Sequence, residues 1–563
     1  MVDYVIVGGG SAGCVLAARL SEDPAVEVCL LEAGPPDTHP LIHIPLGILW
    51  MMRSKVLNWR FHTQPEPQLG GRRLFWPRGR TLGGCGSSNA MLCTRGHASD
   101  YDAWAELGNP GWAFKDVLPY FKRSENHERG ASAYHGVGGP MNVAEQRSPN
   151  VLTRTFVQAG MQCGIPYNDD FNGPRQEGVG LYAVTQKNGR RWSQARGYLA
   201  PAMERPNLRV ITGAQATRIL FEGDRAVGVE YRREGGTEQV HARREVILAA
   251  GAVQSPQLLM LSGVGDADAL KAQGIGVVKH LPGVGKNLQD HLDVLVVHTC
   301  TRAVSGGFTP RNFARGAWEL LRYWFQGKGM LAMVGAEGGG FARSAPDEPI
   351  PDLQLHFNPL RLSNHSLDFG FLFGEGYSLH VCNLRPKSRG EIRLAGRDPL
   401  APPDIVANYL SDPDDMERMV KGVKLARKLL AAPAFDPYRG VELRPEPRCE
   451  SDDEIRAFVR RHAGTIYHPV GTCKMGHDTM AVVDSELRVH GLRGLRVADA
   501  SVMPLLVGGN TNAPTVMIAE KAADMIRASR AAPREAAPAL EAPPARARAG
   551  VGVAQPVVMA TPS

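Results

Sequence analysis

The N-terminal end of the chain has the glycine spacing of a site that binds a dinucleotide. Gly8 follows an apolar strand and permits a tight turn, and Gly10 lets the backbone approach a pyrophosphate. Gly13 lets the next helix pack closely on the sheet, and the N–H groups that begin this helix favour a diphosphate. Glu32 ends the second strand, where a carboxylate can accept hydrogen bonds from ribose hydroxyls and disfavours a 2′-phosphate. These residues predict a site for NAD or FAD rather than NADP.

Three further segments combine glycine with polar side chains. Residues 76–91 place a basic stretch before glycines and serines, a composition that lets backbone wrap a ligand, although a tight loop would look the same. Residues 251–265 follow an apolar strand and open a helix, which packing alone explains about as well. In the polar loops of residues 467–515, Asn512 can cap a helix whose positive end would lie beside it.

The order of the strand and helix signals predicts an α/β protein of two packed domains. The dinucleotide-binding domain is expected to be discontinuous and to comprise residues 1–147, 207–291 and 467–529. The substrate-binding domain is expected to comprise residues 148–206 and 292–466, and alternation such as Leu353-Gln-Leu-His-Phe357 predicts a sheet there. The Ala/Pro-rich residues 530–563 are expected to form a disordered tail.

Composition excludes several classes of function. The net charge of +7 over 563 residues is too small for a nucleic-acid footprint. No basic and apolar leader precedes the first strand, and no apolar run is long enough to span a bilayer. The nine cysteines form no CxxC pair, which argues against a disulfide framework and against a zinc site, and a reducing cytoplasm fits best.

Taken together, the four motif regions resemble the glucose-methanol-choline (GMC) flavoprotein oxidoreductases over nearly the whole chain up to about Arg530. The resemblance implies a Rossmann-like FAD-binding domain interleaved with a substrate domain built on an antiparallel sheet. Leu74–Gly79 and Thr465–Cys473 look most like family members that oxidise aliphatic alcohols, and Asn287–His291 is shared with members that oxidise choline.

The resemblance also implies which residues act. His468 matches the family's catalytic histidine and Asn512 its partner. A neutral imidazole can take the hydroxyl proton while the α-carbon hydride passes to flavin N5, and an amide can hold the alcohol in line. The residues expected to contact FAD are Gly8, Gly10, Ser11, Ala12, Gly13, Glu32, Ala33, Gly83, Gly84, Asn89, Ala216, Asp499 and Ala500.

The expected reaction is oxidation of a primary, aliphatic alcohol to the aldehyde, with electrons passed to a quinone or other acceptor. The alternatives are a choline dehydrogenase, an oxidase, or a hydroxynitrile lyase on the same fold. FAD is expected to be non-covalent, because Ser88 stands where family members with covalently bound flavin carry histidine. Glu337 could face a cationic substrate, but a solvated or backbone-capping carboxylate is favoured.

Two aromatic and apolar stretches, Leu41–Met52 and Trp318–Phe325, are each followed by basic residues. They fit a peripheral membrane contact as well as they fit core packing or a substrate lid. A cytoplasmic location is expected, either free or attached to the inner face of the cytoplasmic membrane.

Overall fold

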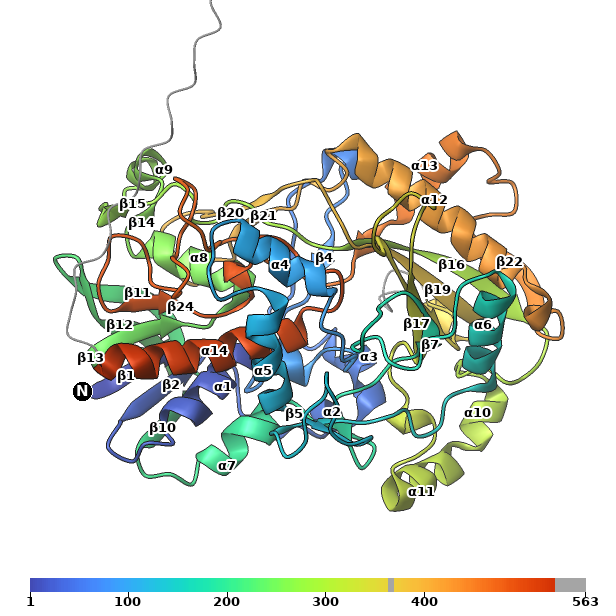
Figure 1. Cartoon of the computed structure of the whole chain (residues 1–563), viewed down its shortest axis with the longest axis horizontal. Coiled ribbons are helices and arrows are strands. Elements are labelled where there is room, and N and C mark those ends of the chain that lie inside the picture. Colours follow the sequence, from blue (N-terminus) through green and yellow to red (C-terminus); the bar gives the residue numbers. More distant parts are fainter. Residues whose placement is uncertain (363–368, 532–563) are drawn as a thin grey trace, which may run out of the picture.

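The computed structural model describes residues 1–362 and 369–531 and is built around two sheets (Figure 1). The first sheet runs in the order β10 (Leu208–Thr212), β2 (Val28–Glu32), β1 (Val2–Val7), β13 (Gly236–Leu248), β12 (Arg225–Arg233) and β11 (Gln215–Glu222), with β24 (Leu495–Val497) also paired to β13. Strands β10, β2, β1, β13 and β24 pair in parallel, whereas β12 and β11 are antiparallel. The carboxyl ends of the parallel strands therefore meet at one edge, where sheets of this kind bind ligands.

Two helices that are far apart in the sequence lie against each other beside this sheet. They are α1 (Ser11–Leu20), which follows β1, and α14 (Asn512–Ala531), near the end of the described chain. Helix α5 (Phe114–Ser124) also packs on α14, and α8 (Gly251–Leu261) follows β13. The tail predicted from residue 530 lies outside the described residues from position 532 onward.

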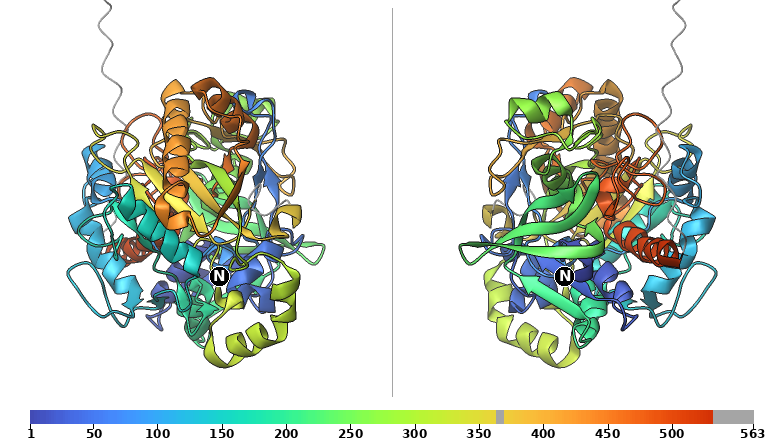
Figure 2. Two further views of the ribbon diagram at one scale, coloured as in Figure 1. Left: turned by 90° about the vertical axis from the view of Figure 1, so that its right-hand side faces the viewer. Right: turned by 90° about the vertical axis from the view of Figure 1, so that its left-hand side faces the viewer.

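The second sheet is antiparallel throughout. Its order is β22 (Arg439–Arg444), β16 (Leu292–Cys300), β19 (Gly376–Asn383), β18 (Leu353–Asn358), β17 (Gly338–Ala342) and β7 (Gly178–Leu181), with β23 (Gly464–Thr465) also paired to β16. Helices α6 (Val151–Gln162) and α12 (Pro413–Leu430) pack on it, and α13 (Asp452–His462) packs on α12 (Figure 2).

The alternation of apolar and polar residues in β18 does not arise from one face being exposed to solvent. Every residue of β18 is buried. The polar residues His356 and Asn358 line an internal cavity rather than contacting solvent. The polar face of this strand is therefore part of a site.

The remaining elements are short connections. The helices are α2 (Pro40–His43), α3 (Ile48–Met51), α4 (Ala98–Glu106), α7 (Ala200–Ala202), α9 (Ala267–Ala272), α10 (Pro310–Ala314) and α11 (Gly316–Gln326). Pairs of short strands are β3 (Phe61–His62) with β4 (Phe75–Trp76), β5 (Glu125–His127) with β6 (Met141–Val143), β8 (Gln186–Lys187) with β9 (Arg190–Arg191), β14 (Val264–Gly265) with β15 (Lys279–His280), and β20 (Glu391–Arg393) with β21 (Asp404–Val406). Among the described residues, no helix has both the length and the apolar character to cross a bilayer.

The predicted domain boundaries stay predictions. The strands of the first sheet come from residues 2–32, 208–248 and 495–497, each within a segment predicted for the dinucleotide-binding domain. The helical turn at residues 195–199, predicted within the substrate-binding segment, packs against α1.

A buried carboxylate joins the helices of the first sheet. Glu520 of α14 has a fully buried side chain. It pairs with Arg19 of α1 at 2.8 Å and with Arg123 of α5 at 2.7 Å, and it accepts a hydrogen bond of 2.6 Å from the Tyr198 hydroxyl. Removing one partner of a buried ion pair leaves the other charges uncompensated, so this contact should be strongly coupled to folding.

We predict that Glu520→Gln lowers the free energy of unfolding by about 3 kcal/mol, because two guanidinium groups lose their shared carboxylate. Glu22→Gln is the matched control. Glu22 also pairs with Arg19, but its side chain is 38 % exposed, and the loss of such a pair should cost at most about 1 kcal/mol. Chemical denaturation of the three purified proteins measures the difference. Equal transitions for Glu520→Gln and the wild type would contradict the role of Glu520.

Candidate active site

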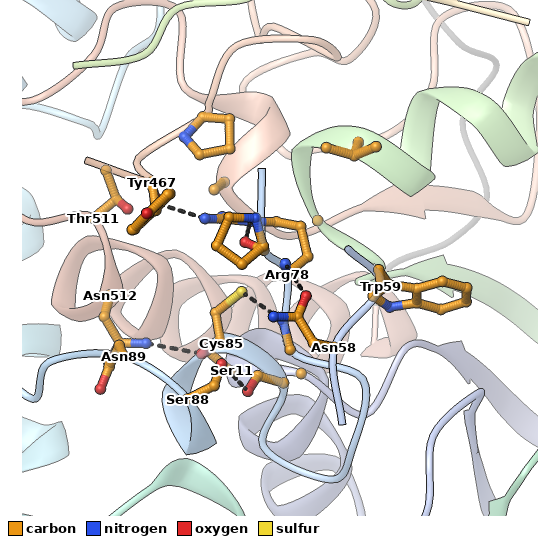
Figure 3. A pocket seen from close by; sticks show the side chains of 18 of the residues that line it. Ser11, Asn58, Trp59, Arg78, Cys85, Ser88, Asn89, Tyr467, Thr511 and Asn512 are labelled. Atoms are coloured by element: carbon orange, nitrogen blue, oxygen red, sulfur yellow. Dashed lines mark hydrogen bonds between the residues drawn. The ribbon is translucent and has the colours of Figure 1, made fainter. Parts of the chain in front are cut away.

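One cavity of about 360 Å³ is lined by residues from both sheets and their connecting loops (Figure 3). Its wall includes most of the residues predicted from the sequence: Gly8, Gly10, Ser11, Ala12, Glu32, Ala33, Gly84, Asn89, Ala216, His468, Asp499, Ala500 and Asn512. The structure therefore gathers residues from distant parts of the chain around a single space.

Gly13 and Gly83 are not in this wall, and they act in the packing behind it. A Cβ atom on Gly13 would lie 1.8 Å from the carbonyl oxygen of Gly8, so only glycine lets α1 approach β1 this closely. Gly83 has a φ of 84°, and its N–H donates to the Gly9 carbonyl at 2.7 Å. Both residues shape the backbone that other residues present to the cavity.

The end of the cavity beside α1 fits a diphosphate. Gly10 lines the cavity, and the nearest protein atom to a Cβ placed there would be 3.9 Å away, so the protein itself leaves room at this position. Helix α1 has no side-chain cap and no acidic residue in its first turn. Its free N–H groups and partial positive charge therefore remain available to an anion.

Glu32 lies at the carboxyl end of β2 in the same wall. Its Oε2 accepts a hydrogen bond from Gly9 N at 2.8 Å, and its Oε1 accepts one from Gly34 N at 2.7 Å. Burial raises the pKa of this carboxyl to about 7, against the lowering effect of these two N–H groups. Each carboxylate oxygen keeps a lone pair that can accept from a ribose hydroxyl.

The N-termini of α1 and α14 are joined directly. Asn512 Nδ2 donates to Ser11 Oγ at 2.8 Å (Figure 3), and Asn512 Oδ1 accepts from Gln194 Nε2 at 2.8 Å. Two positive helix ends thus lie in one cavity wall. The site is suited to a ligand with negative charge at more than one place.

Asp499 connects the start of α8 to this wall. Its Oδ2 accepts from Gly251 N at 2.8 Å and from Ser255 Oγ at 2.6 Å. Its Oδ1 accepts from Ser501 N and Ser501 Oγ. The segment at residues 251–265, which packing alone could explain in the sequence, is therefore tied to the site by a buried carboxylate.

His468 is held by contacts to its own backbone and to that of its neighbour. Its N–H donates to Asp290 Oδ1 at 2.7 Å, and Asp290 also accepts from the hydroxyls of Thr465 and Tyr409. Tyr467 has a φ of 72°, an uncommon conformation for a non-glycine residue, and its carbonyl accepts from Arg78 Nη2 at 2.7 Å. Burial raises the pKa of Asp290 to about 6.

A chain of hydrogen bonds assigns the tautomer of His468. His291 Nε2 lies 3.3 Å from the Leu384 carbonyl, which can only accept, so this nitrogen donates and His291 Nδ1 is left as an acceptor. His468 Nδ1 lies 3.0 Å from His291 Nδ1 and must therefore donate to it. The Nε2 of a neutral His468 is then unprotonated.

Both imidazoles are neutral at physiological pH. Burial lowers the pKa of His468 well below its ordinary value, and the neighbouring His291 and Arg78 lower it further. Burial also lowers the pKa of His291 to about 3, despite its hydrogen bond to Leu384. The site therefore presents a base at neutral pH rather than an imidazolium.

The amide beside His468 belongs to Asn510, and the predicted pairing of His468 with Asn512 is wrong. Asn510 Nδ2 lies 3.2 Å from His468 Nε2. The Asn510 Oδ1 accepts from Thr94 Oγ1 at 3.0 Å and from Gln354 Nε2 at 3.1 Å, which fixes the amide with its NH₂ group toward His468. The amide of Asn512 is occupied by Ser11 and Gln194, because Asn512 is already the first residue of α14.

Sequence reasoning also missed Asp290 and His291, although it singled out their segment. Their roles depend on β16 and β23 meeting side by side, a pairing between residues far apart in the chain. For Asn510 a signal was present, since the loop offers two asparagines separated by one residue. The point at which α14 begins decides between them.

The other end of the cavity is apolar. Its lining includes Leu46, Leu49, Met52, Met333, Leu360 and Leu362. Glu337 is not in the cavity wall. It is buried and accepts hydrogen bonds from Asn150 N and Thr153 Oγ1 at the start of α6, so it acts as a backbone-capping carboxylate.

The chain was compared with known proteins. The GMC oxidoreductase family matches residues 2–293 and 386–519. The chain is 52 % identical to the alcohol dehydrogenase [acceptor] of Pseudomonas putida over 93 % of this chain and 96 % of that protein. It is 47 % identical to human mitochondrial choline dehydrogenase over 93 % of this chain and 89 % of that protein.

Two solved structures are similar to this chain over most of its length. Pyridoxine 4-oxidase from Mesorbium loti superposes with a TM-score of 0.84 at 32 % identity, covering 94 % of this chain and 99 % of that one. An FAD-dependent oxidoreductase from Chaetomium thermophilum superposes with a TM-score of 0.87 at 27 % identity, covering 94 % of this chain and all of that one. The predicted fold class and the predicted cofactor are confirmed. The chain belongs to the GMC oxidoreductase family and is an FAD-dependent oxidoreductase.

Proposed function

We propose that the protein oxidises primary aliphatic alcohols to aldehydes, with His468 as the general base, and passes the electrons to a quinone-type acceptor. The observation that carries this proposal is the unprotonated His468 Nε2, which lies 3.2 Å from the amide of Asn510 in the cavity wall. A base and a fixed donor side by side are what an alcohol group needs in order to lose its proton.

The hydroxyl of the alcohol would lie against both groups and replace their direct contact of 3.2 Å. It would donate to His468 Nε2, while its oxygen accepts from Asn510 Nδ2. As the proton moves to Nε2, the amide stabilises the negative charge that develops on the oxygen. The imidazolium that forms keeps its Nδ1–H donated to His291 Nδ1.

The dinucleotide end of the cavity fits FAD on the features of this chain: the open space at Gly10, the free N-terminus of α1 and the carboxylate of Glu32. When bound, FAD supplies the acceptor for the α-carbon hydride. The positive end of α14 lies in the same wall and favours negative charge there. FAD is held without a covalent bond, because Ser88 offers no imidazole.

The cavity favours an apolar substrate over a cationic one. Among the described residues that line it, the only carboxylates are Glu32 and Asp499, and both are engaged by backbone N–H groups at the dinucleotide end. A trimethylammonium group is normally met by a carboxylate or an aromatic cage. The leucines and methionines at the other end instead match an alkyl chain.

Choline is the second candidate, because human choline dehydrogenase is 47 % identical to this chain. We expect 1-octanol to bleach the visible flavin absorbance of the purified enzyme under anaerobic conditions, and choline to do so on the order of 10²-fold more slowly, because the apolar end of the cavity offers a cation no counter-charge. Stopped-flow absorbance measures both rates. Bleaching by choline alone would replace the proposed substrate, and bleaching by neither would overturn alcohol oxidation.

The correction from Asn512 to Asn510 can be tested by substitution. We expect His468→Ala and Asn510→Ala each to slow flavin bleaching by 1-octanol on the order of 10²-fold or more, because the base or the oxygen-binding donor is lost. Asn512→Ala is the matched control and should slow it less than about tenfold, because its amide faces Ser11 and Gln194.

All three variants should keep FAD at neutral pH and release it on acid precipitation. A larger effect on the bleaching rate from Asn512→Ala than from Asn510→Ala would restore the pairing predicted from the sequence. Flavin that stays on the polypeptide after acid precipitation would contradict non-covalent attachment.

A further inference from the structure

Helices α10 and α11 carry several large, exposed apolar side chains. In α11 the side chains of Trp318, Trp324 and Phe325 are 61 %, 72 % and 79 % exposed, and Leu320 and Leu321 are exposed as well. Figures 1 and 2 show the helix pair at the edge of the molecule, away from both sheets. Large apolar side chains gathered in this way on a surface mark a site of contact with another phase or molecule.

The charges around this face have one sign. Residues 308–330 contain three arginines and one lysine but a single acidic residue, Glu319. Glu319 is already paired with Arg322 at 2.9 Å. Arg311, Arg315 and Lys328 are exposed, so the apolar face is bordered by unneutralised cations.

Two neighbouring segments add basic side chains to this border. Arg190 is exposed and lies 5.9 Å from the ring centre of Trp324, and the exposed Arg147 donates to the carbonyl of Gln326 at the end of α11. Basic side chains around exposed aromatic rings are typical of a surface that enters the headgroup region of an anionic bilayer.

The apolar face continues to the wall of the cavity. The turn at Met330–Ala332 contacts α11 on one side and the turn at Pro45–Gly47 on the other, and Leu46 of the latter lines the cavity. Trp50 of α3 is 43 % exposed, and its ring centre is 6.4 Å from that of Phe308, just before α10. Its neighbour Leu49 lines the cavity.

We propose that the face formed by α10 and α11 docks on the surface of an anionic lipid bilayer and brings the apolar end of the cavity next to the lipid. A second copy of the chain would oppose the same cations to one another, whereas anionic headgroups neutralise them. Delivery of an alkanol and a quinone from the bilayer to the cavity rests on the proposed function. The docking itself does not.

The test is co-sedimentation of the purified holoenzyme with vesicles of phosphatidylcholine containing about one third phosphatidylglycerol, at low and high salt. We expect the double substitution Trp324→Ser and Phe325→Ser to weaken vesicle binding on the order of tenfold or more, because it removes the most exposed aromatic groups. Val441→Ser with Met161→Ser is the matched control, since both residues are exposed and apolar but lie on β22 and α6. The control should bind as the wild type does.

Two further readouts separate the possible failures. Turnover of a soluble alcohol with a soluble dye should be the same in both double variants as in the wild type. A wild type that binds vesicles but does not oxidise alcohols would refute only the proposed function. Absence of wild-type binding, or equal binding by the Trp324/Phe325 variant, would overturn the docking proposal. Light scattering that shows a dimer abolished by the same substitutions, without vesicle binding, would assign the face to a second copy instead.

Discussion

The proposed chemistry of the site depends on one lone pair, that of His468 Nε2. Nε2 carries no proton because the backbone carbonyl of Leu384 can only accept a hydrogen bond, and this forces the tautomer of His291 and then that of His468. Burial keeps both rings neutral. Asp290 and the uncommon backbone of Tyr467 fix where the ring stands. The base is thus set by the backbone around it, which comes from the second sheet and its connections.

The first sheet supplies the other half of the arrangement. Helices α1 and α14 begin next to each other at the cavity, where Asn512 contacts Ser11, and the buried Glu520 joins them further along. The same pair of helices positions Asn510, which lies just before α14, against His468. The segment from Asn510 to the end of α14 therefore supports both the dinucleotide end of the cavity and the proposed alcohol-binding position.

The sequence was informative where the pattern is local. The glycines that precede α1 and the acid that ends β2 predicted a dinucleotide site because turn, helix and strand follow each other within a few residues. Asn512 was assigned by matching the family's motif, and a match shifted by two residues exchanges the roles of two asparagines at the start of α14. His291 and Thr94 could not be assigned because their contacts cross between sheets and loops. The exposed face of α11 was ambiguous for a related reason: an aromatic helix looks the same in sequence whether it is buried or not.

In the proposed mechanism, His468 is a neutral base in the resting enzyme. The most direct measurement is the pH dependence of kcat/KM with a primary alcohol that does not ionise, because this ratio reports the pKa values of the free enzyme. A histidine whose pKa is lowered keeps its lone pair as the pH falls through the ordinary value of 6.5, so kcat/KM should stay level from pH 8 to pH 6.5 and decline only below that range. A decline that begins above pH 6.5 and is centred at or above that value would contradict the claim.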